Sequence, residues 1–343
     1  MVIINHDLEK SLDFLLRYLS NVKKDETLLI CGDKGSDENV LDAAVSVGEK
    51  LGAFTTLNFC KHLRDFKKEP HRKLAISMLN ADVICDFSER YLFRTLSWKK
   101  ALSNGTRGYC LGNLTSDAIM RCIDEKYSKK IMNFGYELYN RTRKANVITI
   151  SSKQGTNITI GMGLIKSRWE IFFKIFRTMR LSWVGEPTGI CHNPGQNTFL
   201  IGQVSFNGIK RSINGTLVFD GSIWPPFELG LISSPIFCKI KNGRIVNIKG
   251  GRDADIFNRW LKKTGNNSVS EIEHFSYGFN PGAILSGCIF EDERVPGSIT
   301  VGIGKYPMHA DCVMIKPTIK IDDDFIEEDG GYRCSSFRET LGH

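Results

Sequence analysis

The chain has 343 residues, which is enough for about two domains with a sizeable core. Its 41% hydrophobic and 24% charged residues are ordinary for a globular protein. The net charge of +8 is dispersed in pairs such as Lys23-Lys24 and Lys99-Lys100, without a dense basic run or interleaved aromatic residues. No apolar run approaches the length that spans a bilayer. We therefore expect neither a nucleic-acid nor a membrane partner.

The ten cysteines include no C-x-x-C pair. Several lie inside apolar runs with strand character, where a free thiol behaves as a small hydrophobic side chain: Cys31, Cys85, Cys110 and Cys312. The first seven residues lack the basic and apolar regions of a secretory signal. These features predict reduced thiols and a cytoplasmic protein.

The first part of the chain alternates helical and strand patterns. Helical spacing of apolar residues or strand-like apolar runs occur, in order, at residues 8–20, 27–32, 38–51, 54–59, 72–79, 82–86, 108–111 and 116–144. This alternation predicts an open α/β sheet with helices on both faces, forming a domain of residues 1–144. The junction at residues 32–37 matches neither common phosphate-loop pattern.

Short strand patterns punctuated by Gly, Pro and Asn replace this alternation from Ala145 onwards. Residues 145–161 predict a hairpin, and the pair Asn242-Gly243 between two alternating runs predicts another. A single helix is expected at residues 254–264. We therefore predict a mainly β (α+β) domain over residues 145–343.

The motif His309-Ala310-Asp311 leads into the apolar run 312–315. Residues i and i+2 of a strand share a face, so this imidazole and carboxylate are expected side by side as two metal ligands. His274, which precedes a Gly/Asn/Pro turn, is the candidate third ligand. Two histidines and one carboxylate form the ligand set of non-haem Fe(II) oxygenases. On spacing alone, a buried hydrogen-bonded histidine and a turn aspartate remain the simpler interpretation.

Six motifs in the second part occur in an order that resembles the thermophilic metallo-aminopeptidases (aminopeptidase T and S). They are residues 155–159, 193–196, 214–221, 278–281, 291–300 and 309–311. The resemblance places the five metal-binding positions of those enzymes at Gln196, His274, Thr300, His309 and Asp311. Gln196 is neutral, Thr300 is a poor zinc or cobalt ligand, and His274 stands where a Glu is expected. A dinuclear peptidase site is therefore not expected.

The remaining set, His274, His309 and Asp311, is similar to that of the 2,5-dihydroxypyridine 5,6-dioxygenases, a branch with the same fold. That resemblance implies a mononuclear Fe(II) that opens a hydroxylated pyridine-type ring with O2. The family places the turn at residues 189–195 against the metal, which makes His192 the candidate acid–base residue; a turn histidine that caps backbone groups is the alternative. The resemblance also implies a homo-oligomer. Candidate residues for contacting the aromatic substrate are Gln196, Tyr277, Thr300 and Trp224. Two alternatives stay open: a hydrolase using Zn, Co or Mn, and a non-catalytic paralogue.

Overall fold

The computed structural model describes residues 6–59, 69–89, 92–163, 182–263, 270–305 and 308–333. Two compact units are present: Met1–Lys129 with Thr188–Ile201, and Lys130–Pro187 with Gly202–His343. The domain boundary near residue 145 stays a prediction. No helix in the described part of the chain is both long and apolar enough to cross a membrane.

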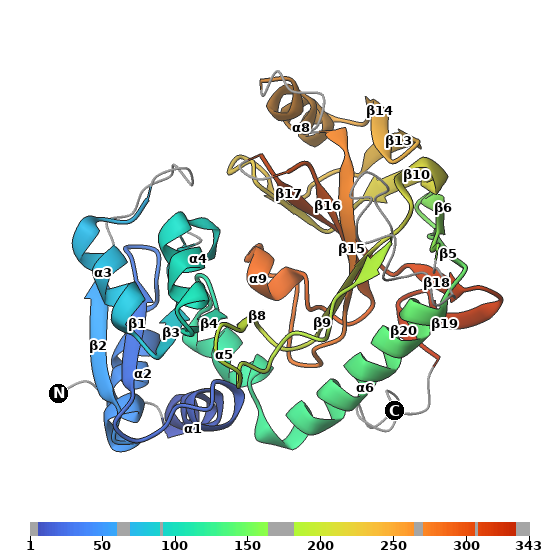
Figure 1. Ribbon diagram of the computed structural model, residues 1–343. Helices are drawn as coiled ribbons and strands as arrows, with labels where there is room; N and C mark the ends of the chain where they lie inside the picture. Colours follow the sequence, from blue (N-terminus) through green and yellow to red (C-terminus); the bar gives the residue numbers. More distant parts are fainter. Residues whose placement is uncertain are drawn as a thin grey trace, which may run out of the picture. The chain divides into compact units, whose positions relative to one another are not determined.

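The first unit contains a sheet of five parallel strands (Figure 1). Its order is β2 (Phe54–Phe59), β1 (Thr27–Gly32), β3 (Val83–Asp86), β4 (Arg107–Cys110) and β8 (Asn197–Phe199). All residues of β3 and β4 and most of β1 are buried, as expected for a parallel sheet covered on both faces. The predicted α/β class is confirmed, and β8 joins this sheet from a distant part of the sequence.

The helices of this unit lie on both faces of the sheet. Along the sheet, β2 lies on one side of β1 and β3 lies on the other, so the chain moves in one direction from β1 to β2 and in the reverse direction from β2 to β3. Both crossovers are expected to be right-handed, and right-handed crossovers in opposite directions place their helices on opposite faces of the sheet. The helical segments are α1 (His6–Phe14), η1 (Leu15–Leu19), α2 (Glu38–Lys50), α3 (Arg72–Asn80), η2 (Leu92–Arg94), α4 (Leu96–Ser103) and α5 (Ser116–Cys122). The four cysteines singled out from the sequence are buried, as their positions in apolar runs predict.

One predicted helix proves to be two. The segment expected as a single helix over 116–144 forms α5 and then α6 (Glu125–Lys144). Ile123 leaves the helical conformation, and Asp124 Oδ1 accepts a hydrogen bond from the Lys126 amide, 2.7 Å away. This side chain satisfies a backbone donor at the start of α6, so Asp124 begins a new helix.

The second unit contains an antiparallel sheet of eight strands. In order they are β14 (Arg244–Lys249), β13 (Ile236–Lys241), β10 (Asn214–Phe219), β6 (Asn157–Gly161), β5 (Val147–Ser151), β18 (Thr318–Ile321), β19 (Asp324–Glu328) and β20 (Gly331–Tyr332). Both predicted hairpins are confirmed, as β5–β6 and β13–β14. Asn242 and Gly243 have φ of 52° and 70°, as a two-residue hairpin turn requires.

A seven-stranded antiparallel sheet carries the candidate metal ligands (Figure 1). Its order is β12 (Gly230–Leu231), β11 (Ser222–Trp224), β17 (Ala310–Ile315), β16 (Ser298–Ile303), β15 (Ile272–Gly278), β9 (Gln203–Asn207) and β7 (Trp183–Val184). The other segments are α8 (Arg252–Lys263), where one helix was predicted, α9 (Ile289–Asp292) and η3 (Lys210–Ser212). One face of the sheet is apolar, with Phe206 stacked between Phe275 and Tyr277.

Candidate metal site

Strand register brings the three candidate ligands together. His274 on β15 lies opposite Gly302 on β16, which in turn lies opposite Asp311 on β17. Residues that face each other across neighbouring strands project to the same side of a sheet. His309 comes two residues before Asp311, so strand alternation gives it the same face. Residues 35 positions apart in the sequence thus meet on one surface.

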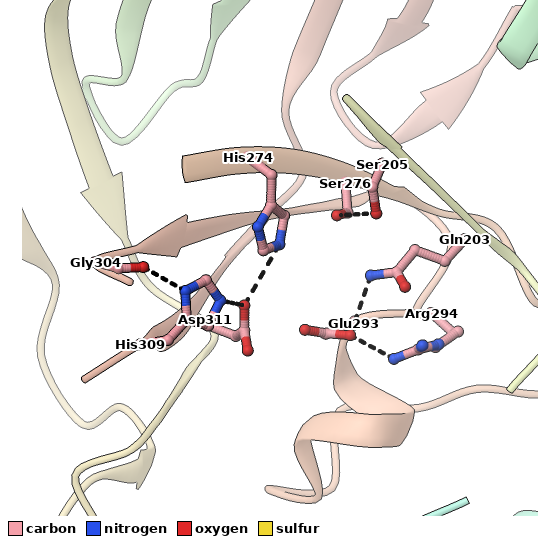
Figure 2. Close-up of polar contacts among 9 residues, drawn as sticks. All are labelled: Gln203, Ser205, His274, Ser276, Glu293, Arg294, Gly304, His309 and Asp311. Atoms are coloured by element: carbon pink, nitrogen blue, oxygen red, sulfur yellow. Dashed lines mark hydrogen bonds and ion pairs between the residues drawn. The ribbon is translucent and has the colours of Figure 1, made fainter. Parts of the chain in front are cut away.

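The ligand atoms converge on one carboxylate oxygen (Figure 2). Asp311 Oδ1 lies 2.9 Å from His309 Nε2 and 3.5 Å from His274 Nε2. One ligand atom from each residue lies within 4.8 Å of the others, and no other such group of His, Cys, Asp or Glu occurs among the described residues. Ligands about 2.1 Å from a metal ion and at right angles are about 3 Å apart, so this spacing fits a single ion.

The hydrogen bonds of His309 give a physical reason for a cation. Its Nδ1 donates to the Gly304 carbonyl oxygen, 2.6 Å away, because a carbonyl can only accept. This bond selects the tautomer in which Nε2 has a free lone pair, and that lone pair faces the acceptor Asp311 Oδ1. Two acceptors at 2.9 Å repel each other unless a proton or a metal ion lies between them. Such an outer hydrogen bond is usual for a metal-binding histidine.

Gly302 leaves room for the His274 ring. A Cβ atom at position 302 would lie 2.1 Å from Cε1 and 2.2 Å from Nδ1 of His274. The imidazole therefore occupies the volume that any other side chain on β16 would fill. This close approach lets His274 lean across the middle strand toward Asp311, and the two imidazole rings stack with centroids 5.2 Å apart.

A carboxylate that the sequence interpretation left out lies beside the three ligands (Figure 2). Glu293, at the end of α9, accepts hydrogen bonds from Gln203 Nε2 at 3.0 Å and Arg294 Nη1 at 2.5 Å. Burial, and then the negative charge of Asp311, raise the pKa of Glu293 to about 7, against the opposing effect of Arg294. The acidic turn 291–293 belonged to the motifs that carried the resemblance, but its spacing gave no indication of which acid faces the site.

Two predicted substrate residues share the face of the ligands. Thr300 lies two residues before Gly302 on β16, and Trp224 lies opposite Asp311 on β11. Thr300 is buried, and its Oγ1 has no hydrogen-bond partner among the described residues. An unsatisfied buried hydroxyl is uncommon and is often satisfied by a water or a ligand. Trp224 is half-buried and packs edge-on against Phe227.

The structure does not bring Tyr277 to the ligands. It lies three residues after His274 on β15, and an odd separation places two strand residues on opposite faces. Tyr277 is fully buried in the aromatic core against Phe206, with ring centroids 4.9 Å apart, and its hydroxyl accepts a hydrogen bond from Thr142. The separation of three residues between His274 and Tyr277 already indicated in the sequence that they would lie on opposite faces of a strand.

His192 and Gln196 belong to the first compact unit. Gln196 Oε1 accepts hydrogen bonds from the backbone amides of His192 and Asn193, and these bonds stabilise the turn formed by residues 192–196. The ring Nε2 of His192 lies 2.6 Å from the Tyr18 carbonyl oxygen. The acid–base role of His192 and the substrate-binding role of Gln196 stay predictions.

The fold and this site were compared with known proteins. The fold is that of the aminopeptidase T class: AmpT (aminopeptidase T) from Thermus thermophilus matches with a TM-score of 0.67 and 12% identity over 96% of this chain and 99% of that one. The 2,5-dihydroxypyridine dioxygenase from Pseudomonas putida KT2440 matches with a TM-score of 0.77 and 16% identity over 96% and 98% of the two chains.

The family model for 2,5-dihydroxypyridine 5,6-dioxygenase matches residues 15–333. The chain belongs to this family. No curated protein sequence matches it closely enough to add to the comparison.

Proposed function

We propose that this protein is a ring-cleaving dioxygenase that opens a hydroxylated, pyridine-type aromatic ring with O2. The observation that carries the proposal is the convergence of His274 and His309 on Asp311 Oδ1, in a chain that belongs to the dioxygenase family. We further propose Fe(II) as the metal, because two imidazoles and one carboxylate with open positions are the ligand set of non-haem iron oxygenases.

The protein's own contribution would be to hold the reactants. A bound Fe(II) would supply a centre at which O2 and the substrate oxygen meet, through the positions that three protein ligands leave open. The Gly304 carbonyl would keep the His309 lone pair directed at the metal. The Thr300 hydroxyl, which lacks a hydrogen-bond partner among the described residues, would form a hydrogen bond with the substrate. Trp224 would contact the aromatic ring of the substrate.

The predicted roles of His192 and Gln196 in acid–base chemistry and substrate binding belong to the same proposal. Tyr277 is better suited to supporting the sheet, because it packs in the core of the opposite face. The substrate class is a small aromatic molecule together with O2. The homo-oligomeric state and the cytoplasmic location also stay predictions.

A metal-dependent hydrolase is the second candidate, favoured by the fold shared with AmpT. Such an enzyme would use Zn, Co or Mn to lower the pKa of a bound water. The described residues contain one group of potential ligands, which supports a mononuclear site over a dinuclear one. A non-catalytic paralogue is the least supported alternative, since it would have no use for three metal-ligating side chains that converge within 4.8 Å of one another.

Metal content and oxygen uptake together test the proposal. Protein purified without oxygen is reconstituted with Fe(II), and oxygen consumption is followed with a panel of dihydroxypyridines. We expect one iron per chain and oxygen uptake that depends on the pyridine. Bound zinc or cobalt with peptide hydrolysis and no oxygen uptake would favour the hydrolase. Absence of both activities in metal-loaded protein would favour the non-catalytic alternative.

A further inference from the structure

Three consecutive acids follow one another at the end of α9, and only one of them is directed at the ligands. Glu291 accepts hydrogen bonds from the Ile284 amide and the Ser286 hydroxyl, and Asp292 accepts from the amides of residues 286 and 287. These two acids hold the preceding loop. Glu293 makes no such bond, and its carboxylate lies between the metal-ligand group and Gln203 (Figure 2).

The two oxygens of Glu293 have different surroundings. Gln203 Nε2 and Arg294 Nη1 both donate to Oε2, whereas Oε1 accepts no hydrogen bond from any described residue. Oε1 is the oxygen turned toward the metal-ligand group (Figure 2). Two donors on one oxygen fix the orientation of the carboxylate, and the other oxygen keeps its lone pairs available. Arg294 and Gln203 are themselves buried, so this orientation is rigidly supported.

This arrangement suits a group that accepts a proton. The carboxylate is preoriented, one oxygen is available, and the metal-ligand group lies on the side where a substrate hydroxyl would bind. A general base must come within hydrogen-bond reach of the proton that it removes. The orientation of Oε1 toward the metal-ligand group serves that geometric requirement (Figure 2).

We propose that Glu293 Oε1 removes the proton from the substrate hydroxyl that binds at the His274, His309 and Asp311 group. In this step the substrate O–H bond breaks, an O–H bond forms on Oε1, and the electron pair stays on the ring oxygen as an oxyanion. The inference rests on the proposed ring-cleaving function and adds the residue that activates the substrate. Gln203 and Arg294 act as positioning residues for the carboxylate.

The test separates proton transfer from metal binding and from turnover. Protein loaded with Zn(II), which does not react with O2, is mixed with 2,5-dihydroxypyridine at about pH 8, well above the ordinary pKa of a carboxyl group. Ultraviolet absorption reports the ring oxyanion, and an indicator dye reports protons released to the medium. For the wild type we expect the oxyanion band with little proton release, because the proton passes to Glu293.

The Glu293→Gln variant keeps the size and the hydrogen-bonding shape of the side chain. With an unchanged zinc content, we expect it either to lack the oxyanion band or to release about one proton per bound pyridine. With Fe(II), its turnover should fall about 100-fold, as is typical for the loss of a general base. Should this variant fold poorly, Glu293→Asp keeps the charge beside Arg294 and is judged by the same two readouts.

Three outcomes would overturn the inference. The first is a Glu293→Gln variant with an unchanged band and no added proton release. The second is loss of zinc from this variant, which would make Glu293 a metal ligand. The third is an equal effect of Glu291→Gln, the matched control from the same turn, which would indicate a general disturbance of the loop. If the wild type neither binds the pyridine nor forms the oxyanion, the proposed function fails as well.

Discussion

The imidazole of His274 lies over Gly302, in the space that a side chain on the neighbouring strand would fill. We expect Gly302→Ala to push the ring off Asp311, because the new methyl group would lie within 2.8 Å of three ring atoms. Metal affinity should fall about 10- to 100-fold, as for the loss of other groups that orient metal ligands. Metal titration measures this effect. Gly331→Ala is the control, since a Cβ there meets no atom closer than 3.4 Å.

Replacing either ligand of the motif His309-Ala310-Asp311 should abolish metal binding. His309→Ala deletes the ligand whose tautomer is set by Gly304, and Asp311→Asn replaces the charged oxygen on which both histidines converge. We expect both variants to purify with less than one tenth of the wild-type metal, and to show no turnover, because three ligands are the minimum here. Metal analysis and oxygen uptake measure this. Wild-type activity in either variant would contradict the site assignment.

Tyr277→Phe distinguishes the two faces of the sheet. The substitution removes one hydroxyl, which accepts a hydrogen bond from Thr142 in the core. The unfolding free energy should fall by about 1 kcal/mol, the usual value of one hydrogen bond. Turnover should stay within about twofold of the wild type, since Tyr277 faces away from the ligands. Denaturant unfolding and steady-state kinetics test both statements. A large rise in KM would indicate that Tyr277 contacts the substrate after all.

Thr300→Val tests the unsatisfied hydroxyl on the metal-site face. The substitution keeps the shape of the side chain and removes an oxygen that has no partner among the described residues. The melting temperature should be unchanged or higher, because no protein hydrogen bond is lost. The KM for the pyridine substrate should rise about tenfold if the hydroxyl binds it, which corresponds to about 1.4 kcal/mol. A lowered melting temperature would instead show that the hydroxyl has a structural partner.

Glu327 provides a test of pH dependence away from the site. Burial raises the pKa of this carboxyl well above its usual range, so the folded protein holds a proton that the unfolded chain loses near pH 4. The unfolded state therefore binds fewer protons above that pH, and stability falls as pH rises toward the folded pKa. Glu327→Gln should remove this dependence. We expect the unfolding free energy of the variant to exceed that of the wild type by more at about pH 8 than at about pH 5.

Local patterns were sufficient for much of the fold. The alternation of helices and strands predicted the parallel sheet, and Asn242-Gly243 predicted its hairpin because only a few residues adopt positive φ readily. The i and i+2 spacing of His309 and Asp311 predicted that they share a face, because strand alternation depends on neighbouring residues alone. The same rule, applied to His274 and Tyr277, would have separated them.

Cross-strand register and packing decided the rest. That His274 meets Asp311 depends on which residues of β15, β16 and β17 lie opposite one another, and the chain between them contains a loop and α9. Glu291 and Asp292 lie within α9 and bind the preceding loop, whereas Glu293 follows the last residue of the helix and faces the ligands. The position of α9 relative to the sheet decides this division. β8 joins a sheet whose other strands come from the first 110 residues. These relationships are long-range in sequence, so no local spacing encodes them, and only the tertiary structure decides them.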